Sequence, residues 1–293
     1  MKKNTIVITG GAGFVGSNLI ILLLKRTNFK IISIDNYTSG FVKNHIKDNR
    51  IKYIKGDTKD INRLLRNPKN INSIFHFGEF ARIYQSFLNM NNCINSNTIG
   101  SNAVFNFCLK NDIKLIYSAT SATLGNKGND KNLSPYAFTK AKNLELLENL
   151  KKWFNFKYEV IYFYNVYGPN QICEGKMATV IGIFENCFKK NKPLTVVKPG
   201  NQSRRFTHIY DTVETCYVAW KANKCRHYSI SNRKSYTILQ VAKMFGSKIK
   251  YLKERPGERY ASALTNINLK NKVFKHFGKI SLKEYVNKIT SLL

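Results

Sequence analysis

The sequence predicts an α/β fold in which a doubly wound parallel sheet carries a smaller C-terminal lobe. In the first 120 residues, short apolar runs alternate with helical patterns, which is typical of βαβ units around a parallel sheet buried on both faces. A glycine-rich turn joins the first apolar run to the first helical pattern. After about residue 166 the alternation fades, and glycine, proline and basic residues become denser around 192–205, which predicts the smaller lobe.

The expected elements follow in order along the chain. Buried-strand patterns occupy 5–9, 30–34, 51–54, 73–77, 115–118 and 158–162, because each is a short apolar run. Helical patterns occupy 17–25, 97–109 and 135–151. We assign 1–165, with about 207–230, to the domain of the large sheet, and 166–206 with 231–293 to the smaller lobe.

Length and composition narrow the class of protein. The chain has 293 residues, 43% of them hydrophobic and 13% aromatic, which suffices for a packed core and excludes global disorder. No apolar run reaches the roughly 20 residues of a membrane span, and no signal peptide is visible. The 6 cysteines include no CxxC pair, so neither a disulfide framework nor a metal site is expected. We expect a soluble, cytoplasmic protein.

The net charge is unusually high. The sequence has 48 Lys and Arg against 17 Asp and Glu, a formal charge of +31. Such a balance fits a nucleic-acid partner, but abundant Lys, Asn and Ile are also what an AT-rich genome produces. The charges are spread along the chain apart from short clusters such as 189–190 and 204–205, so we favour the compositional explanation. Phosphate-bearing small ligands fit both explanations.

The glycine turn has the pattern of a dinucleotide-binding loop. Gly10 allows the tight turn, Gly13 lets the backbone approach a pyrophosphate, and Gly16 lets the helix pack close to the sheet. The helix N-terminus then presents free N–H groups to the anion. Asp35 ends the next strand 19 residues after Gly16, where a carboxylate binds both ribose hydroxyls and repels a 2′-phosphate. This pattern predicts NAD, and the alternative is a glycine-rich turn without a ligand.

Two later strand ends extend the same predicted site. Asp57 follows the third strand, where its carboxylate can accept from the adenine amino group. Phe77 and Gly78 end the fourth strand, where a small residue lets the backbone approach the cofactor. His76 is expected to be structural. The cofactor-binding residues expected from these segments are Gly10, Gly13, Phe14, Val15, Gly16, Asp35, Asn36, Asp57, Thr58, Phe77 and Gly78.

A tyrosine and a lysine open the helix predicted at 135–151. Tyr136 and Lys140 are four residues apart and project from one helical face. A nearby ammonium and a positively charged nicotinamide ring both favour the phenolate, which makes Tyr136 a usable base near neutral pH. The strand pattern upstream runs into small hydroxyl residues at its carboxyl end. Thr120 or Ser121 could there hold the hydroxyl group that Tyr136 deprotonates.

Taken together, these segments resemble the extended short-chain dehydrogenase/reductases, and among them the NAD-dependent nucleotide-sugar epimerases and dehydratases of the UDP-glucose 4-epimerase type. The resemblance covers nearly the whole chain in the family's order, through TGGAGFVGSNL, GDTKD, HFG, SATSAT, SPYAFTK, YNVYGPNQ, RRFTHIYD and RPGE. It implies a Rossmann-type sheet that binds NAD and a C-terminal lobe that binds the nucleotide-sugar substrate.

The resemblance also implies a role for individual residues near the reacting atoms. Tyr136 matches the general base and Lys140 the lysine that binds the nicotinamide ribose, so both also belong to the cofactor site. Thr120 matches the catalytic hydroxyl residue, and Ser121 follows it towards the sugar. Asn97 matches an asparagine, in a helix at the sheet edge, that supports the active site, and we count it with Tyr136 and Lys140 among the cofactor-binding residues.

Three further matches concern the substrate. Asn165 matches a residue that contacts the sugar nucleotide, and Arg204 and Arg255 match two arginines that clasp its diphosphate. A guanidinium fork suits that task, because it binds phosphate oxygens bidentately.

The implied reaction is epimerisation by transient oxidation at C4 and return of the hydride, with NAD regenerated in each cycle. The alternatives are a 4-oxidase, 4-reductase or 4,6-dehydratase on the same substrate class, or a nucleic-acid-binding relative of the fold. Ser121 and Ala122 stand where dehydratases of the family carry an Asp-Glu pair, which argues against elimination. The family also implies a homodimer, built as a four-helix bundle from the helices after Asn97 and Tyr136.

Overall fold

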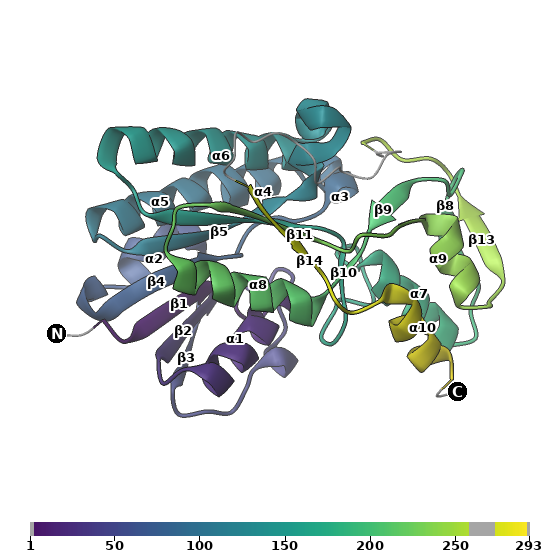
Figure 1. Ribbon diagram of the computed structural model, residues 1–293, viewed down its shortest axis with the longest axis horizontal. Coiled ribbons are helices and arrows are strands. Elements are labelled where there is room, and N and C mark those ends of the chain that lie inside the picture. The colour runs from purple at the N-terminus through teal and green to yellow at the C-terminus, as the bar shows by residue number, and fades with distance from the viewer. Residues whose placement is uncertain (1–2, 258–272, 292–293) are drawn as a thin grey trace.

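The computed structural model describes residues 3–257 and 273–291, and an eight-stranded parallel sheet runs through this part of the chain (Figure 1). The strand order is β14-β11-β6-β5-β4-β1-β2-β3, with every neighbouring pair parallel. The strands are β1 (Thr5–Thr9), β2 (Lys30–Asp35), β3 (Ile51–Lys55), β4 (Ile71–His76), β5 (Lys114–Thr120), β6 (Tyr158–Phe163), β11 (His227–Ser231) and β14 (Val273–Phe277). The predicted doubly wound α/β class is confirmed.

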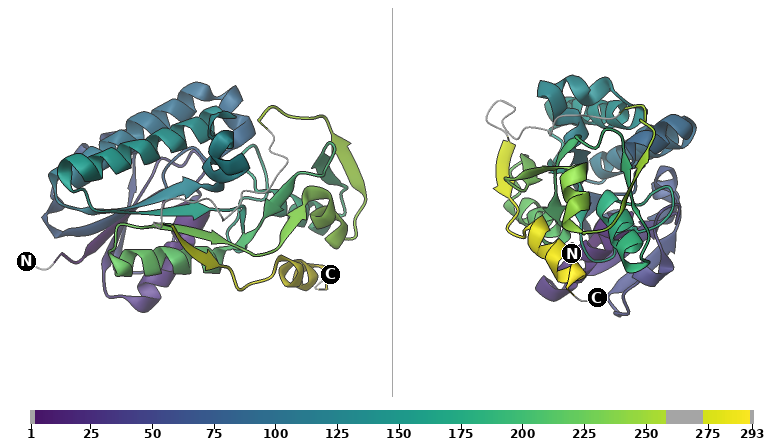
Figure 2. Two further views of the ribbon diagram at one scale, coloured as in Figure 1. Left: turned by 45° about the horizontal axis from the view of Figure 1, so that its top comes forward. Right: turned by 90° about the vertical axis from the view of Figure 1, so that its right-hand side faces the viewer.

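Helices cover both faces of this sheet (Figures 1 and 2). One face carries α1 (Phe14–Arg26) and α8 (Ile209–Ala222), and the other carries α2 (Ile61–Leu64), α5 (Ser101–Lys110) and α6 (Pro135–Phe154). Alternate side chains of a strand point to opposite faces, so Ile6 and Ile8 of β1 pack in the core beneath α1 and α8. Val7, between them, packs in the core beneath α5 and α6. Burial on both faces explains why the strands read as apolar runs.

The smaller lobe lies beyond the carboxyl ends of the strands and has its own core (Figures 1 and 2). Within it β8 pairs with β13 and β9 with β12, and Phe184, Leu194 and Phe245 pack at its centre. Its elements are α7 (Val180–Lys189), β8 (Leu194–Val197), β9 (Ser203–Arg205), β12 (Ser235–Thr237), α9 (Ile238–Met244), β13 (Ile249–Leu252) and α10 (Leu282–Thr290).

Shorter elements connect these parts. The paired strands β7 (Val166–Tyr167) and β10 (Thr207–His208) lie where the chain passes between the sheet and the smaller lobe. The others are α3 (Ile83–Leu88), α4 (Met90–Ile94), the π-helix η4 (Asn95–Gly100), and the 3₁₀ segments η1 (Val42–Asn44), η2 (Thr58–Asp60), η3 (Pro68–Asn70) and η5 (Ser121–Asn132).

Two elements differ from the sequence-based expectation. The stretch 231–293 was assigned to the smaller lobe, yet its strand β14 pairs in parallel with β11 and forms an edge of the large sheet. The helix expected at 97–109 is the C-terminal part of a longer helical run, in which the π-helix η4 precedes α5. A π-helical turn often accompanies a functional site, and this one contains Asn97.

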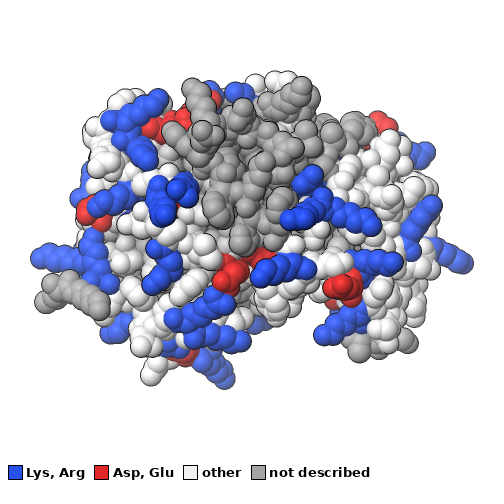
Figure 3. All heavy atoms as spheres, in the orientation of Figure 1, with Lys and Arg blue, Asp and Glu red and all other residues white. Residues whose placement is uncertain are grey.

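The face shown in Figure 3 is basic, without one concentrated patch among the described residues that it displays. On the face shown in Figure 3, Lys and Arg side chains are spread over many elements, with a few Asp and Glu side chains among them. A spread of this kind fits the compositional explanation of the +31 charge better than a dedicated polyanion surface. Among the described helices, none is both long and apolar enough to cross a membrane.

Candidate functional site

A single large cleft crosses the carboxyl ends of the central strands and continues into the smaller lobe. Strand β1 lies between β2 and β4, so the chain connections reverse direction beside it, which is where open α/β sheets bind ligands. The cleft has a volume of about 1890 Å³. A pocket for one small molecule measures roughly 300–1,000 Å³, so this cleft has room for a dinucleotide and a second ligand.

The glycine loop forms one wall of the cleft and fits a pyrophosphate. Gly10 has φ +70°, and a Cβ there would lie 2.8 Å from the main-chain nitrogen of Gly78. A Cβ on Gly16 would lie 2.2 Å from the carbonyl oxygen of Gly10, which explains the close approach of α1 to the loop. Gly13 is the N-cap of α1 and provides no capping side chain. Phe14 and Val15 follow it at the cleft wall, so the helix N-terminus is available to an anion.

Asp35 is held rigidly at the edge of the cleft. Its carboxylate accepts hydrogen bonds from the main-chain nitrogens of Ala12, at 3.0 Å, and Tyr37, at 2.9 Å. Burial raises the pKa of Asp35, and these two N–H donors oppose the rise. Gly40 leaves room for it, because a Cβ there would lie 2.7 Å from Asp35 Oδ1. This geometry fits the predicted contact with the adenosine ribose.

The strand ends beside Asp35 complete this part of the cleft. Asn36 Nδ2 donates to Asp57 Oδ2 at 3.1 Å, while the other oxygen of Asp57 accepts from the main-chain nitrogen of Lys59 and caps η2. Thr58 and Phe77 line the cleft next to them. The cofactor residues predicted from the glycine loop and these strand ends thus all line one cleft, and together they fit NAD.

The predicted catalytic residues line the same cleft. Ser134 caps α6, its Oγ accepting from the main-chain nitrogen of Ala137 at 3.1 Å, so Tyr136 stands in the first helical turn. The main-chain nitrogen of Tyr136 donates to Ser86 Oγ at 3.2 Å, and the residue is 9% exposed. Thr120 and Ser121 stand at the carboxyl end of β5 and also line the cleft.

Lys140 forms a buried ion pair with a carboxylate that the sequence analysis did not single out. Its ammonium donates to Glu79 and to the main-chain carbonyl of Ser118, and the two charged side chains are 3% and 1% exposed. Burial lowers the pKa of Lys140, whereas the charge of Glu79 raises it. Glu79 also accepts hydrogen bonds from Ser101 Oγ (2.8 Å), Tyr117 Oη (3.1 Å) and Asn143 Nδ2 (3.3 Å).

Asn97 stands behind the cleft wall and does not line it, in contrast to every other predicted site residue. Its Oδ1 accepts from the main-chain nitrogen of Phe80 at 2.7 Å, and its Nδ2 donates to the carbonyl of Phe80 at 3.0 Å. Asn97 therefore fixes the segment that carries Glu79, next to Lys140. This position agrees with support of the site, and not with a direct contact to the cofactor.

The predicted substrate residues line the part of the cleft that enters the smaller lobe. Arg204 lies on β9, and Asn165 Nδ2 donates to the main-chain carbonyl of Arg205 next to it at 2.9 Å. Arg255 reaches the cleft from the segment after β13, with its Cζ 5.0 Å from the ring centroid of Tyr84 on α3. Both arginines therefore face the space that a second ligand would occupy.

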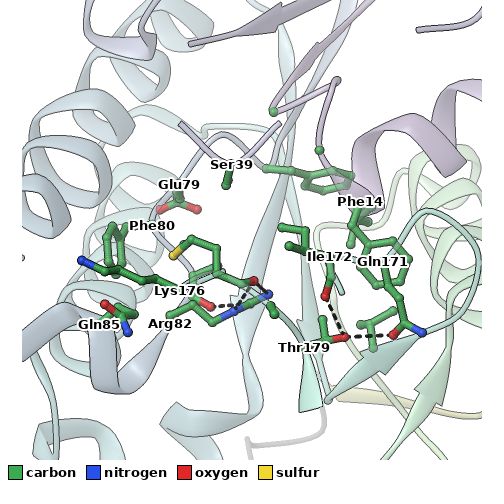
Figure 4. Close-up of a pocket in the computed structure, with 18 of the residues that line it drawn as sticks. Phe14, Ser39, Glu79, Phe80, Arg82, Gln85, Gln171, Ile172, Lys176 and Thr179 are labelled. Carbon is green, nitrogen blue, oxygen red and sulfur yellow. Dashed lines mark hydrogen bonds between the residues drawn. The ribbon is translucent and has the colours of Figure 1, made fainter. Parts of the chain in front are cut away.

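Sequence reasoning missed several polar side chains of the cleft, which belong to no motif. Figure 4 shows Arg82, Gln85 and Lys176 on one side of the cleft and Gln171 and Thr179 on the other. Glu79 could have been found from the sequence, because it is a carboxylate directly after the strand end His76-Phe77-Gly78. Arg82 could not have been found in this way, because its position in the cleft depends on hydrogen bonds to a distant segment of the chain.

His76 is structural, as predicted, and it makes folding depend on pH. The ring is 0% exposed and bonded to Thr9 Oγ1 at 2.7 Å and Ser101 Oγ at 3.0 Å, and burial lowers its pKa to about 4. The unfolded chain takes up this proton near pH 6.5, so the stability from neutral His76 is complete above that pH. It is lost as the pH falls towards 4, by about 3 kcal/mol.

Urea unfolding between pH 7 and pH 4 checks this expectation, with His76→Asn as the comparison. The carboxylates titrate in both proteins, so the difference between their slopes isolates His76. We expect the free energy of unfolding to fall less steeply in the variant. Equal slopes would show that His76 takes up its proton equally easily in the folded and unfolded chains.

Comparison with known proteins places this cleft in a family context. The family model of the NAD-dependent epimerase/dehydratase family matches residues 6–232. The chain is 27% identical to a putative UDP-glucose 4-epimerase of Methanocaldococcus jannaschii, over 98% of this chain and 97% of the relative. It is 28% identical to dTDP-D-glucose 4,6-dehydratase of Dictyostelium discoideum, over 81% of this chain and 60% of the relative.

A solved structure has the same fold over nearly its full length. The UDP-N-acetylglucosamine 4-epimerase of Methanobrevibacter ruminantium, solved in complex with UDP-N-acetylmuramic acid, superimposes with a TM-score of 0.82. The two chains are 26% identical, and the match covers 99% of this chain and 97% of the other. Epimerases and dehydratases both occur among the relatives, so the choice between the two reactions depends on the residues of the cleft.

Proposed function

The chain belongs to the NAD-dependent epimerase/dehydratase family, and on that premise we propose that it is an NAD-dependent epimerase of a nucleotide-activated sugar. The reaction is an oxidation of the sugar at C4, followed by return of the hydride to the opposite face. The observation that supports this most is that Tyr136, Lys140 and Thr120 line the same cleft as the glycine loop.

The residues of the cleft divide the chemistry between them. NAD held by the glycine loop and Asp35 would supply the acceptor for the hydride of C4. Thr120 holds the C4 hydroxyl group, and the phenolate oxygen of Tyr136 takes its proton as the C4 hydrogen leaves. Lys140 favours the phenolate by its positive charge. When the hydride comes back, Tyr136 returns the proton to the same oxygen, so atoms and electrons balance over the cycle.

The polar groups near the reacting carbon support epimerisation over dehydration. Elimination of water from the sugar needs an acid and a base beyond Tyr136, and Ser121 and Ala122 are the residues that follow Thr120. The carboxylate nearest to Lys140 is Glu79, whose oxygens already accept several hydrogen bonds within the protein. Glu79 is therefore occupied and 1% exposed, which leaves it poorly suited to take a proton from the sugar.

Product analysis tests the reaction. We expect purified protein, incubated with UDP-, dTDP-, GDP- and ADP-sugars, to convert at least one into an isomer of unchanged mass, without net formation of NADH. Mass spectrometry and NMR of the products check both points. A product lighter by one water would contradict epimerisation in favour of a dehydratase, and stoichiometric NADH would indicate an oxidase.

Exposed apolar side chains support the further proposal that the protein is a homodimer. Met90, Ile99 and Phe138 are 55%, 51% and 45% exposed, on α4, η4 and α6. An apolar groove lined by Phe87, Met90, Ile94, Leu133 and Phe138 continues this surface. A four-helix bundle formed by α5 and α6 of two copies would cover part of it.

The cysteines support the proposal of a cytoplasmic location. All 6 cysteines are free thiols, as expected in a reducing compartment.

A further inference from the structure

Arg82 connects two segments of the cleft wall, the one that follows β4 and the one that contains Met177. It is the N-cap residue of α3, shortly after the end of β4. Its Nε and Nη2 donate to the carbonyl oxygen of Met177, at 3.0 and 2.5 Å, and its Nη1 donates to the carbonyl oxygen of Ala81 at 2.8 Å (Figure 4). The side chain is thereby fixed between these two segments, in an orientation that does not depend on a ligand.

The guanidinium has no carboxylate partner within the described residues. No Asp or Glu of this part lies within ion-pair distance of it, and its acceptors are neutral main-chain carbonyls. Of the five N–H donors of a guanidinium, these hydrogen bonds engage three and leave two for the cleft. Burial lowers the pKa of Arg82. The carbonyl oxygen of Arg82 accepts from the main-chain nitrogen of Ser86 at 3.1 Å, and Ser86 Oγ in turn accepts from the main-chain nitrogen of Tyr136 at 3.2 Å. Arg82 therefore lies close to the proposed base.

The neighbours of Arg82 add to a local excess of positive charge. Lys176, the exposed residue before Met177, is drawn close to Arg82 in Figure 4. Gln85 beside them is uncharged, and its buried Oε1 has no hydrogen-bond partner in the described structure. The acidic residues nearby do not balance this charge, because Glu79 pairs with Lys140 and Glu174 pairs with Lys190.

The proposed substrate accounts for only part of the positive charge of the cleft. Its diphosphate is assigned to Arg204 and Arg255, in the half of the cleft that enters the smaller lobe. Of the other cations that line the cleft, Lys43 and Lys59 come from the segments after Asp35 and Asp57, on the cofactor side, and Lys140 pairs with Glu79. Arg82 and Lys176 remain, and Arg82 is linked through Ser86 to Tyr136, where the sugar ring would react. A ligand that neutralises this remaining charge carries its own anionic group on the sugar.

We propose that Arg82 binds a carboxylate on the sugar, so that the preferred substrate class is a nucleotide-activated uronate or other acidic sugar. The planar fork of a guanidinium matches the two oxygens of a carboxylate, and bonds between two charged partners are stronger than those between neutral groups. This inference rests on the proposed function, because it names the substrate class of the same cleft. Arg82 would act as a specificity-determining residue, whereas Tyr136 acts on the reacting hydroxyl group.

Binding to NAD-loaded protein tests the inference with matched neutral and acidic sugars. The probes are UDP-glucose with UDP-glucuronate, and GDP-mannose with GDP-mannuronate, measured by titration calorimetry. We expect the wild type to bind the uronate of at least one pair about tenfold more tightly. Arg82→Gln should abolish that preference while changing the affinity for the neutral sugar by less than about threefold. Arg82→Lys, which keeps the charge and loses the fork, should keep part of the preference.

A matched control separates the effect of removing a positive charge in the cleft from the effect of removing one anywhere on the protein. Arg63→Gln also removes a guanidinium, but its side chain is 72% exposed and lies outside the cleft, so both affinities should stay unchanged. If Arg82→Gln weakens both sugars equally, Arg82 is a brace between two segments and the inference is wrong. Preference of the wild type for neutral sugars overturns it as well. If Arg82→Gln does not fold, Arg82→Lys is the test: a smaller preference for the uronate with an unchanged affinity for the neutral sugar supports the inference, and an undiminished preference contradicts it.

Failure of the proposed function has a different signature. If the uronate binds through Arg82 and is not converted into an isomer, Arg82 is assigned correctly and the epimerase proposal is wrong. If the neutral sugar is converted and the uronate is not bound, the epimerase proposal stands and the role of Arg82 is wrong. If no sugar nucleotide of either pair binds, both proposals are contradicted.

Discussion

Tyr136→Phe is expected to lower turnover by about 10²–10⁴-fold while NAD stays bound. The change removes one oxygen atom from the cleft and with it the proposed proton acceptor. The ring itself should remain in place, since its main-chain nitrogen is bonded to Ser86 Oγ and its neighbours Ala122 and Ala137 pack around it. Steady-state rates and the NAD content of the purified variant check the two halves of this expectation.

The control for this change is another tyrosine that loses the same oxygen. Tyr210 on α8 is 54% exposed and does not line the cleft, so Tyr210→Phe should leave turnover unchanged. Turnover of Tyr136→Phe within about threefold of the wild type would show that another group accepts the proton. Loss of NAD together with activity would instead show that Tyr136 acts in cofactor binding.

Lys140→Met is expected to have a second large effect, on stability as well as on turnover. It removes the ammonium that favours the phenolate, and it leaves Glu79 as a buried carboxylate without its cation. Removing one partner of a buried ion pair costs about 3–5 kcal/mol of stability, because the remaining charge stays out of water. Denaturant unfolding and steady-state kinetics measure the two effects on the same protein.

The double variant Lys140→Met/Glu79→Gln separates these effects. A neutral amide in place of the carboxylate should restore most of the lost stability, while turnover remains low because the ammonium is still missing. Lys142→Met is the matched control on the same helix, since Lys142 is 55% exposed and pairs with Glu145 at the surface. If the double variant recovers turnover as well as stability, Lys140 acts only as the partner of Glu79.

Local pattern in the sequence was enough to predict much of the fold and of the cofactor half of the cleft. The glycine loop could be located because its spacing follows directly from a tight turn between a strand and a helix, and Gly10 and Gly16 have the close contacts that this turn requires. Tyr136 and Lys140 could be paired because four residues is one helical turn. Asp35 could be placed because it ends the strand next to the loop.

The rest depends on contacts between distant segments. Arg82 reaches a carbonyl 95 residues further along the chain, and Glu79 pairs with a lysine 61 residues away. No sequence pattern within one segment indicates which distant segment it will contact. The position of β14 could not be predicted from its sequence for the same reason. It pairs with β11, and that edge of the sheet exists only once the other strands have assembled.

The buried ion pair between Glu79 and Lys140 affects the charge available next to Tyr136. The sequence analysis placed the ammonium of Lys140 near Tyr136 and named no counter-charge, whereas the structure gives Lys140 a buried partner in Glu79. An opposite charge weakens the effect of the ammonium on the phenol. In return, Glu79 keeps Lys140 protonated in a place where burial alone lowers its pKa. Glu79 is therefore a positioning residue of the proposed site, with Asn97 fixing the adjacent segment.

Isotope retention tests the central claim, that a hydride leaves C4 and comes back within one cleft. A sugar nucleotide that the protein converts is labelled with deuterium at C4 and incubated in ordinary water until both epimers are present. We predict that the product keeps the deuterium at C4, because the hydride never exchanges with solvent. Replacement of the label by solvent hydrogen would contradict the account, since the inversion would then proceed by loss of a proton.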